Sequence, residues 1–216
     1  MRTILTTIAL LITLATKVGA ECVNLCDIGW WSSATLEDLE VQSNIAASLN
    51  LRDKYGNTPL HLAANKSTPR TIKMLLDSGA RLEARNISGR TPLHMAADYG
   101  SAESVKALLN AGAKVMVRDD KGKTPLFSAA AWATSASLQY LLNAGADVNA
   151  VNVAGEIALH NAAGWGTSDN VLILLDAGSN VHAKANNDKT SWDYAQSNES
   201  LQGTAGFWAL NDARFK

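Results

Sequence analysis

The chain has 216 residues, and its 19 basic and 20 acidic side chains give a formal net charge of −1 at pH 7. Because no basic cluster is present to neutralise phosphates, nucleic acid is excluded as an expected partner. After the first 20 residues no apolar stretch is long enough to span a bilayer, so we expect no stable membrane insertion.

The first 20 residues have the pattern of a secretory signal peptide. Arg2 provides a positive start, residues 4–15 form a mostly apolar run, and the small residues 18–20 precede Glu21. This pattern predicts cleavage after residue 20. A membrane anchor is the alternative, but the run is much shorter than the roughly 20 apolar residues that a spanning helix needs. We therefore expect an exported protein, periplasmic or secreted, that begins at Glu21.

The only two cysteines are Cys22 and Cys26, at the start of the expected mature chain. An even number of cysteines in an exported chain predicts one disulfide between them. The four-residue offset fits one helical turn, where the two alpha carbons lie at about bridging distance. A metal site would need further ligands nearby, and the sequence shows none. Lipidation of Cys22 is another alternative, although residues 19–21 do not resemble a lipobox.

From residue 58 onward one six-residue pattern occurs five times, each copy beginning 33 residues after the previous one. The copies begin at Thr58, Thr91, Thr124, Ile157 and Thr190. A fixed period of this length indicates a solenoid, in which each short unit buries its apolar face only by stacking on its neighbours. We therefore expect one elongated domain rather than two globular ones.

Each 33-residue unit carries the signals of two short helices. In the unit 86–118, Thr91 can cap a helix, and Pro92 suits its first position because a proline lacks the N–H that is unused there. A second helix is predicted where apolar residues follow a 3.6-residue period, and Gly112 ends it. The glycine stops of the neighbouring units are Gly79, Gly145 and Gly178.

These units resemble ankyrin repeats. The Thr-Pro-Leu-His, Leu-Leu, Gly-Ala and Asp-x-x-Gly elements carry the resemblance over residues 53–195. The resemblance implies an all-α solenoid in which each repeat is a turn or hairpin finger followed by two antiparallel helices, stacked into a curved array with a concave recognition face. It also implies a structural role for His61, His94 and His160, which would tie each helix start to adjoining backbone.

The resemblance implies a domain organisation as well. An N-terminal capping repeat, 21–52, is followed by four repeats, 53–85, 86–118, 119–151 and 152–184, and then by a C-terminal capping repeat, 185–216. The caps resemble those of small exported bacterial ankyrin repeat proteins, a looser match than the repeats. The side chains expected to close the C-terminal end are Trp192, Leu201, Phe207, Trp208 and Leu210.

Two repeats depart from the pattern. Phe127 replaces the histidine of the third repeat, and Ile157 and Ala158 replace the Thr-Pro pair of the fourth. Since a lost helix cap costs about 1 kcal/mol, the junction of these two repeats is the predicted weak point of the array.

In the ankyrin pattern the residues after the paired alanines face the concave groove, which implies recognition roles for Asp98, Tyr99, Trp132 and Trp165. The three aromatic residues share one repeat position, and such rings are typical interface hot spots. The alternative is that the rings lie flat against the next repeat and seal the groove. Apolar residues at the turn tips extend the candidate surface, namely Tyr55, Ile87 and Val153.

A row of basic residues, Arg52, Arg85, Arg118 and Lys184, also recurs with the repeat. We interpret it as a solvated face rather than an anion site, because basic residues are common at this position of ankyrin repeats and Val151 interrupts the row.

Together these features predict an exported, non-enzymatic module that binds a protein partner, with an inhibitor, immunity or host-directed interaction protein as a narrower form. We expect a monomer without metal or cofactor and assign no catalytic residue, because Asp98, His94 and His160 each have a structural explanation. The alternative is a carbohydrate-binding protein that stacks sugar rings on the aromatic stripe.

Overall fold

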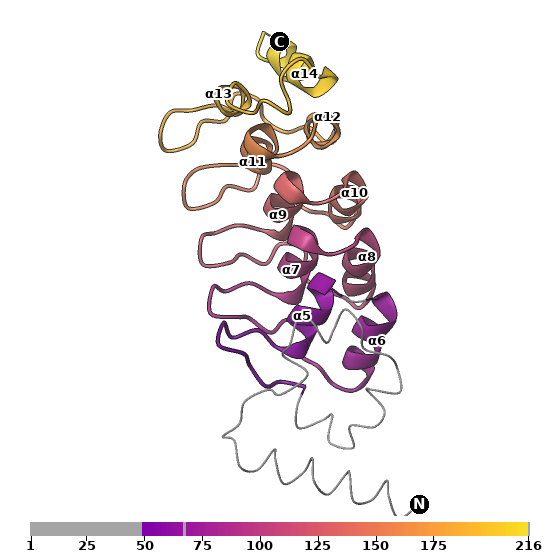
Figure 1. Cartoon of the computed structure of the whole chain (residues 1–216). Coiled ribbons are helices and arrows are strands. Elements are labelled where there is room, and N and C mark those ends of the chain that lie inside the picture. Colours follow the sequence, from indigo (N-terminus) through magenta and orange to yellow (C-terminus); the bar gives the residue numbers. More distant parts are fainter. Residues whose placement is uncertain (1–48, 67, 216) are drawn as a thin grey trace, which may run out of the picture.

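The computed structural model describes residues 49–66 and 68–215. The expected signal peptide 1–20, the expected Cys22–Cys26 disulfide and most of the expected capping repeat 21–52 lie outside the described residues. The described part of the chain contains ten α-helices, α5 to α14, and no β-strand beyond one isolated bridge between Lys184 and Thr190. The predicted all-α class is confirmed (Figure 1).

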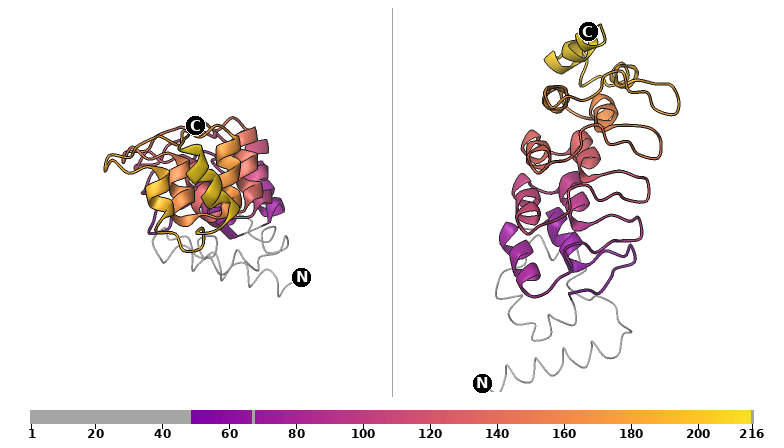
Figure 2. Two further views of the ribbon diagram at one scale, coloured as in Figure 1. Left: turned by 90° about the horizontal axis from the view of Figure 1, so that it is seen from above. Right: turned by 180° about the vertical axis from the view of Figure 1, so that it is seen from behind.

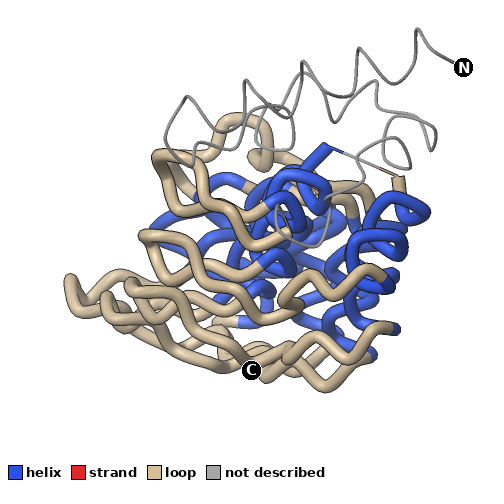
Figure 3. The backbone as a smooth tube through the Cα atoms, turned by 90° about the horizontal axis from the view of Figure 1, so that it is seen from below, coloured by secondary structure: helices blue, strands red, loops and turns tan. Residues whose placement is uncertain are grey.

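The helices form two rows (Figures 1 and 2). The inner row contains α5 (Pro59–Lys66), α7 (Pro92–Tyr99), α9 (Pro125–Trp132), α11 (Ala158–Trp165) and α13 (Ser191–Ala195). The outer row contains α6 (Pro69–Asp77), α8 (Ala102–Asn110), α10 (Ser135–Asn143), α12 (Ser168–Asp176) and α14 (Ala205–Ala213). Each helix packs on the next helix of its own row. The loops leading to the inner helices project to one side as fingers (Figure 3).

The helix boundaries follow from local chemistry. Thr91 and Thr124 adopt extended backbone conformations at the starts of α7 and α9, and a proline occupies the first position of each helix. In the outer row, the hydroxyl of Ser101 accepts the N–H of Ser104 at 3.1 Å and so caps α8. The outer helices α6, α8, α10 and α12 are followed by glycines with φ between 82° and 101°, at Gly79, Gly112, Gly145 and Gly178. Glycine adopts this left-handed conformation without steric cost.

The core lies between the two rows. Each of α5, α7, α9 and α11 contributes a leucine that is at most 2% exposed, at Leu60, Leu93, Leu126 and Leu159. The same helices carry pairs of fully buried alanines, at 63–64, 96–97, 129–130 and 162–163. Because an alanine side chain is a single methyl group, neighbouring inner helices can approach closely. The outer helices add Ile72, Val105, Leu138 and Val171, each 0% exposed.

The C-terminal end of the core is closed largely as expected. Leu201 and Leu210 are fully buried, and the rings of Trp192 and Phe207 lie 4.7 Å apart between centroids. Trp208 is 55% exposed, so the expectation that it closes this end is wrong. Helix α14 turns the face that contains Gly206 and Leu210 towards the core. Trp208 lies two positions from each of them and is therefore on the opposite face of the helix.

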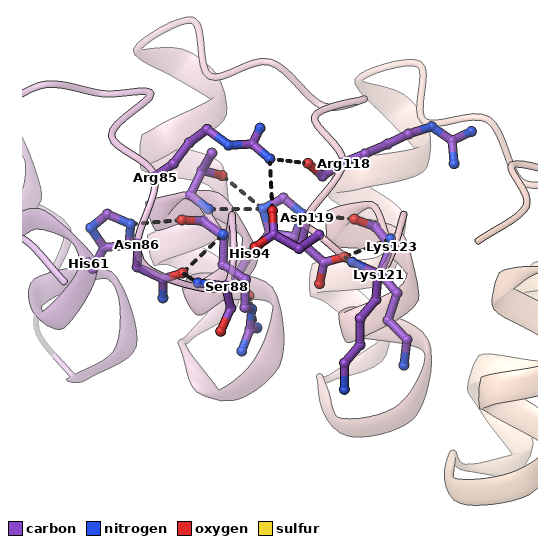
Figure 4. A network of polar contacts seen from close by, with 12 residues as sticks. His61, Arg85, Asn86, Ser88, His94, Arg118, Asp119, Lys121 and Lys123 are labelled. Carbon is purple, nitrogen blue, oxygen red and sulfur yellow. Dashed lines mark hydrogen bonds and ion pairs between the residues drawn. The ribbon is translucent and has the colours of Figure 1, made fainter. Parts of the chain in front are cut away.

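Three histidines connect successive repeats. His61 and His94 each accept the backbone N–H of the threonine three residues earlier at Nδ1, at 3.1 Å in both cases. Their Nε2 atoms lie 3.0 Å from the carbonyls of Arg90 and Lys123 in the following fingers (Figure 4). His160 makes the equivalent contacts. The structural role implied for these residues is confirmed.

The exposed arginines form a second set of connections between repeats. Arg52 donates to the carbonyl of Arg85 at 2.6 Å, Arg85 donates to that of Arg118 at 2.7 Å, and Arg118 donates to that of Val151. The row was expected to be a solvated face; its side chains are exposed, but each guanidinium also links one connecting segment to the next. Figure 4 shows the contact from Arg85 to the carbonyl of Arg118. The row stops at Val151, which has no donor to continue it.

Candidate protein-interaction surface

Three aromatic residues stand at the ends of consecutive inner helices. Tyr99, Trp132 and Trp165 are the last residues of α7, α9 and α11 and are 60%, 58% and 66% exposed. We call them the aromatic stripe. The rings do not seal the groove, because more than half of each side chain faces solvent. Trp132 and Trp165 stack on each other, with ring centroids 6.5 Å apart and ring planes 24° apart.

The chain leaves each of these helices in an extended conformation. Gly100, Ala133 and Gly166 follow the three aromatic residues, and each N–H donates back to an alanine carbonyl of the helix it terminates. A Cβ at Gly100 would meet the carbonyl of Ala64, and one at Gly166 would meet that of Ala130. Glycine at these two positions therefore permits close packing on the preceding repeat at the base of the stripe.

Two buried asparagines hold the helix ends in place. The amide of Asn170, on α12, donates to the carbonyls of Ala130 and Ala133 at 3.3 and 3.2 Å. The amide of Asn198 donates in the same way to the carbonyls of Ala163 and Gly166, at 3.1 and 3.3 Å. Because the last carbonyls of a helix lack intrahelical partners, these bonds fix the backbone that carries Trp132 and Trp165. No role was predicted from the sequence for either asparagine.

A hollow of about 440 Å³ lies between the fingers and the inner helices. Its lining includes Arg90 and Asp98, Trp132 and the finger-tip residue Ile87, and Asn161 of α11. Ile87, Asp98 and Trp132 are thus brought together, as the sequence predicted for one surface. We call the combination of hollow and aromatic stripe the inner face.

Asp98 is only 8% exposed and makes an ion pair with Arg90. The same guanidinium nitrogen of Arg90 also donates to the carbonyl of His94 at 3.2 Å. The carboxylate therefore lines the hollow with its charge already compensated, rather than projecting from the surface. A partner group could reach the remaining lone pairs of Asp98 only by entering the hollow.

The other predicted finger-tip residues are exposed but lie outside this hollow. Tyr55 is 54% exposed and Val153 is 72% exposed, compared with 68% for Ile87. Val153 lines a second hollow, of about 420 Å³, with residues of the neighbouring finger. Backbone hydrogen bonds join successive fingers, for example from the N–H of Ile87 to the carbonyl of Tyr55 at 3.1 Å. The tips therefore form one continuous row.

The buried histidines have a structural role. Burial lowers the pKa of His61 and of His94 from 6.5 to about 4, because the charged imidazolium loses its hydration. Burial also lowers the pKa of His160. Both ring nitrogens of each histidine contact backbone groups, so none is available as a general base. Among the described residues, no group of three or more His, Cys, Asp or Glu side chains could hold a metal ion.

Within residues 49–66 and 68–215, none of the helices has both the length and the hydropathy needed to cross a membrane.

A family model that describes three copies of the ankyrin repeat matches residues 32–119 and 112–185. The matched region covers more than half of the chain, and the chain belongs to the ankyrin repeat family. Ankyrin repeats generally mediate protein–protein interaction, and proteins built from them are typically non-enzymatic binding modules.

Proposed function

We propose that this ankyrin repeat protein binds a protein partner on its inner face, with the aromatic stripe as the centre of the contact. The observation that carries the proposal is the exposure of Tyr99, Trp132 and Trp165 on three consecutive inner helices. Large rings that remain in solvent in the free protein stabilise it little and gain most when a partner covers them.

The inner face is also pre-organised. Asn170 and Asn198 fix the helix ends, and Trp132 and Trp165 support each other by stacking. A surface that is already ordered loses little conformational entropy on binding, so more of the contact energy appears as affinity. This arrangement supports a recognition role for the stripe.

The first 20 residues support a narrower form of the proposal, in which the protein acts outside the cytoplasm after cleavage before Glu21. In that form the protein is periplasmic or secreted and contains the Cys22–Cys26 disulfide. It acts as a monomer, as an inhibitor, immunity or host-directed interaction protein. Intact-mass measurement of the protein from its native source, before and after reduction and alkylation, tests both the cleavage and the disulfide.

The test of partner binding uses matched tryptophan variants. The purified wild-type protein, Trp132→Ala and Trp208→Ala are each immobilised and exposed to extracts of the source organism and its surroundings. A partner of the inner face is retained by wild type and by Trp208→Ala, because that exposed tryptophan lies on α14, and it is lost with Trp132→Ala. Equal retention of the partner by all three proteins would show that the aromatic stripe is not part of the interface.

Carbohydrate binding is the second candidate, and the stacked pair of exposed tryptophans is the observation that favours it. A sugar ring could cover an indole face in the same way as a partner side chain. Titration of the purified protein with soluble oligosaccharides, with no other protein present, separates the two candidates, because a protein-specific surface gives no saturable signal.

A further inference from the structure

We propose that the inner face binds an acidic segment of its protein partner, with a carboxylate of that segment paired to Lys123 beside Trp132. This inference rests on the proposed function, since it names the chemical class of the partner segment that meets the inner face. The second and third repeats differ at the two positions that matter for it, one at the end of the finger and one on the inner helix.

In the second repeat the finger cation has an internal partner, because Arg90 makes an ion pair with Asp98 of α7. The equivalent residues of the third repeat, 33 positions later, are Lys123 and Ala131. The backbone at the two finger residues is alike, since the N–H of each donates to the side-chain oxygen of the residue four positions earlier, at 3.0 and 2.8 Å. The third repeat thus keeps the cation and has a methyl group where the second repeat has a carboxylate.

The side chain of Lys123 differs in this respect from those at the same position of the other repeats. Asn57 and Glu156 take part in side-chain hydrogen bonds, and Arg90 makes its ion pair. The ammonium of Lys189 lies over an aromatic ring, 5.9 Å from its centroid. The ammonium of Lys123 has no partner among the described residues. Its three N–H donors therefore remain for a ligand.

Lys121, on the same finger, adds a second unpaired ammonium. Lys121 and Lys123 both line the hollow that contains Trp132, and both also line the hollow of about 420 Å³ beside the next finger. Figure 4 shows the two long side chains extending from their finger in the same direction. Within residues 49–66 and 68–215 the ammonium of Lys121 has no partner either. Two such groups on one finger attract an anion.

The carboxylates that line the two hollows do not offer an equivalent site for a cation. They belong to Asp98, Asp119, Asp120 and Glu156. Each already has a donor: a guanidinium for Asp98 and, at 3.9 Å, for Asp120; two backbone N–H groups for Asp119; a tyrosine hydroxyl and an asparagine amide for Glu156. An incoming ammonium would compete with these donors, whereas an incoming carboxylate meets donors that have no acceptor. The local complementarity therefore favours an acidic ligand.

Lys123 and Trp132 have different tasks in this interface. Both line the same hollow, so a segment that brings a carboxylate to Lys123 also brings neighbouring side chains to the exposed ring of Trp132. An exposed ion pair adds little affinity, but it fixes the register of a segment and rejects segments of the wrong charge. The aromatic stripe then provides the contact area, and Lys123 determines which segment is accepted.

The test uses a blocked peptide of six glutamates, titrated into the purified protein at low ionic strength and followed by the indole N–H resonance of Trp132. We expect saturable binding that weakens about fivefold in Lys123→Gln, as for the loss of an exposed ion pair, and persists in Lys123→Arg. Ala131→Asp supplies an internal carboxylate and should weaken binding as much as Lys123→Gln does.

The matched controls separate charge from shape. Ala131→Asn adds a side chain of the same size as aspartate without its charge, and this variant should bind the peptide like wild type. Lys114→Gln removes an exposed lysine outside both hollows and should also leave binding unchanged. A blocked peptide of six glutamines should not bind.

Three results would overturn the inference: no saturable binding of the glutamate peptide, equal binding of the glutamine peptide, or binding that is unchanged in Lys123→Gln. Binding of a soluble oligogalacturonate through Lys123, without binding of the glutamate peptide, would assign the site to acidic sugars instead. If a captured protein partner requires Trp132 but is retained equally by wild type and Lys123→Gln, the proposed function stands and only this inference fails.

Discussion

The ring of Phe127 lies where three other repeats have an imidazole, and the hydroxyl of Thr124, three residues earlier, is buried with no hydrogen-bond partner among the described residues. In the second repeat the equivalent hydroxyl, of Thr91, lies 2.9 Å from His94 Nδ1. A phenyl ring has no acceptor for a hydroxyl and no donor for the carbonyl of the next finger. The third repeat therefore lacks three contacts that His94 makes in the second repeat, to the hydroxyl and the backbone N–H of the threonine and to the carbonyl of the next finger.

We expect Phe127→His to stabilise the protein by about 1 kcal/mol at pH 7.5, because the gain from satisfying a buried hydroxyl exceeds the lost apolar burial. Chemical denaturation measures the change. Phe127→Leu is the control, since it removes the ring without adding hydrogen bonds and should be destabilising. A histidine variant that is less stable than wild type at pH 7.5 would contradict this account of the third repeat.

The stability of the array should fall as the pH is lowered from about 6.5 towards 4. The pKa values of His61 and His94 are about 4 in the folded protein, so between pH 6.5 and 4 the unfolded chain binds more protons than the folded one. Each histidine contributes a loss of roughly 1 kcal/mol at pH 5.5 and roughly 3 kcal/mol below pH 4. Denaturation midpoints at pH 7.5, 5.5 and 4.5 measure it.

The matched control for this pH dependence is His94→Gln, whose amide can accept and donate hydrogen bonds but does not titrate. We expect this variant to show a smaller loss of stability between pH 7.5 and 4.5 than wild type. Asp193 acts in a lower range, because hydrogen bonds from Thr190 lower its pKa below 3.8 and its contribution is lost only at more acidic pH. Equal pH profiles for wild type and His94→Gln would show that burial of His94 is not the cause.

The helices were predictable from the sequence because each boundary has a local cause. Thr91 and Pro92 determine the start of α7, and Gly112 follows the end of α8, without reference to distant residues. The shared position of the three aromatic residues was predictable for a related reason, since a repeat position that ends one inner helix ends the others too. Their exposure was not, because the same residues could have packed against the next repeat.

Other features of the inner face depend on contacts that no local pattern encodes. The side-chain amide of Asn170 donates to carbonyls 37 to 41 residues earlier in the chain. The equivalent positions of the two preceding repeats hold Ser137 and Ser104, so the repeat pattern does not distinguish Asn170 from an ordinary residue near a helix start. The pairing of Asp98 with Arg90 joins a residue near the end of α7 to the residue just before its N-cap, a pairing that the repeat pattern does not indicate. The sequence therefore predicted that Asp98 belongs to the surface but not that its charge is compensated.

The start of α11 provides a test of the consensus pattern. Ile157 is 1% exposed, and its N–H donates to His160 Nδ1 at 3.1 Å, so this helix is capped without a threonine hydroxyl. We expect Ile157→Thr to change stability little, because the added hydrogen bond offsets lost apolar burial. Ala158→Pro should stabilise by about 0.5 to 1 kcal/mol, since a proline suits the first helical position. A lower denaturation midpoint for Ala158→Pro would contradict the expected backbone geometry.

Asn170 offers a test of how the stripe is held. Asn170→Ala removes the donors to three carbonyls at the end of α9, and we expect a loss of about 2 kcal/mol in unfolding free energy together with a weaker near-ultraviolet signal from Trp132. Asp169→Ala, at the exposed neighbouring position, is the control and should cost at most about 0.5 kcal/mol. Retention of the aromatic signal in Asn170→Ala would show that Trp132 is positioned by its own helix alone.

The stacking of Trp132 on Trp165 should be measurable in the free protein. Because both side chains are more than half exposed, each single change to alanine should cost about 1 kcal/mol or less, compared with 3 to 5 kcal/mol for a buried ring. A double-mutant cycle of Trp132→Ala and Trp165→Ala should give a coupling of about 0.5 to 1 kcal/mol, as expected for rings 6.5 Å apart. Trp132→Ala combined with Trp208→Ala should be additive, because Trp208 lies on α14 in the last unit of the stack. A coupling near zero for the stacked pair would mean that the two rings move independently in solution, and that any ordering of the stripe occurs only when a partner binds.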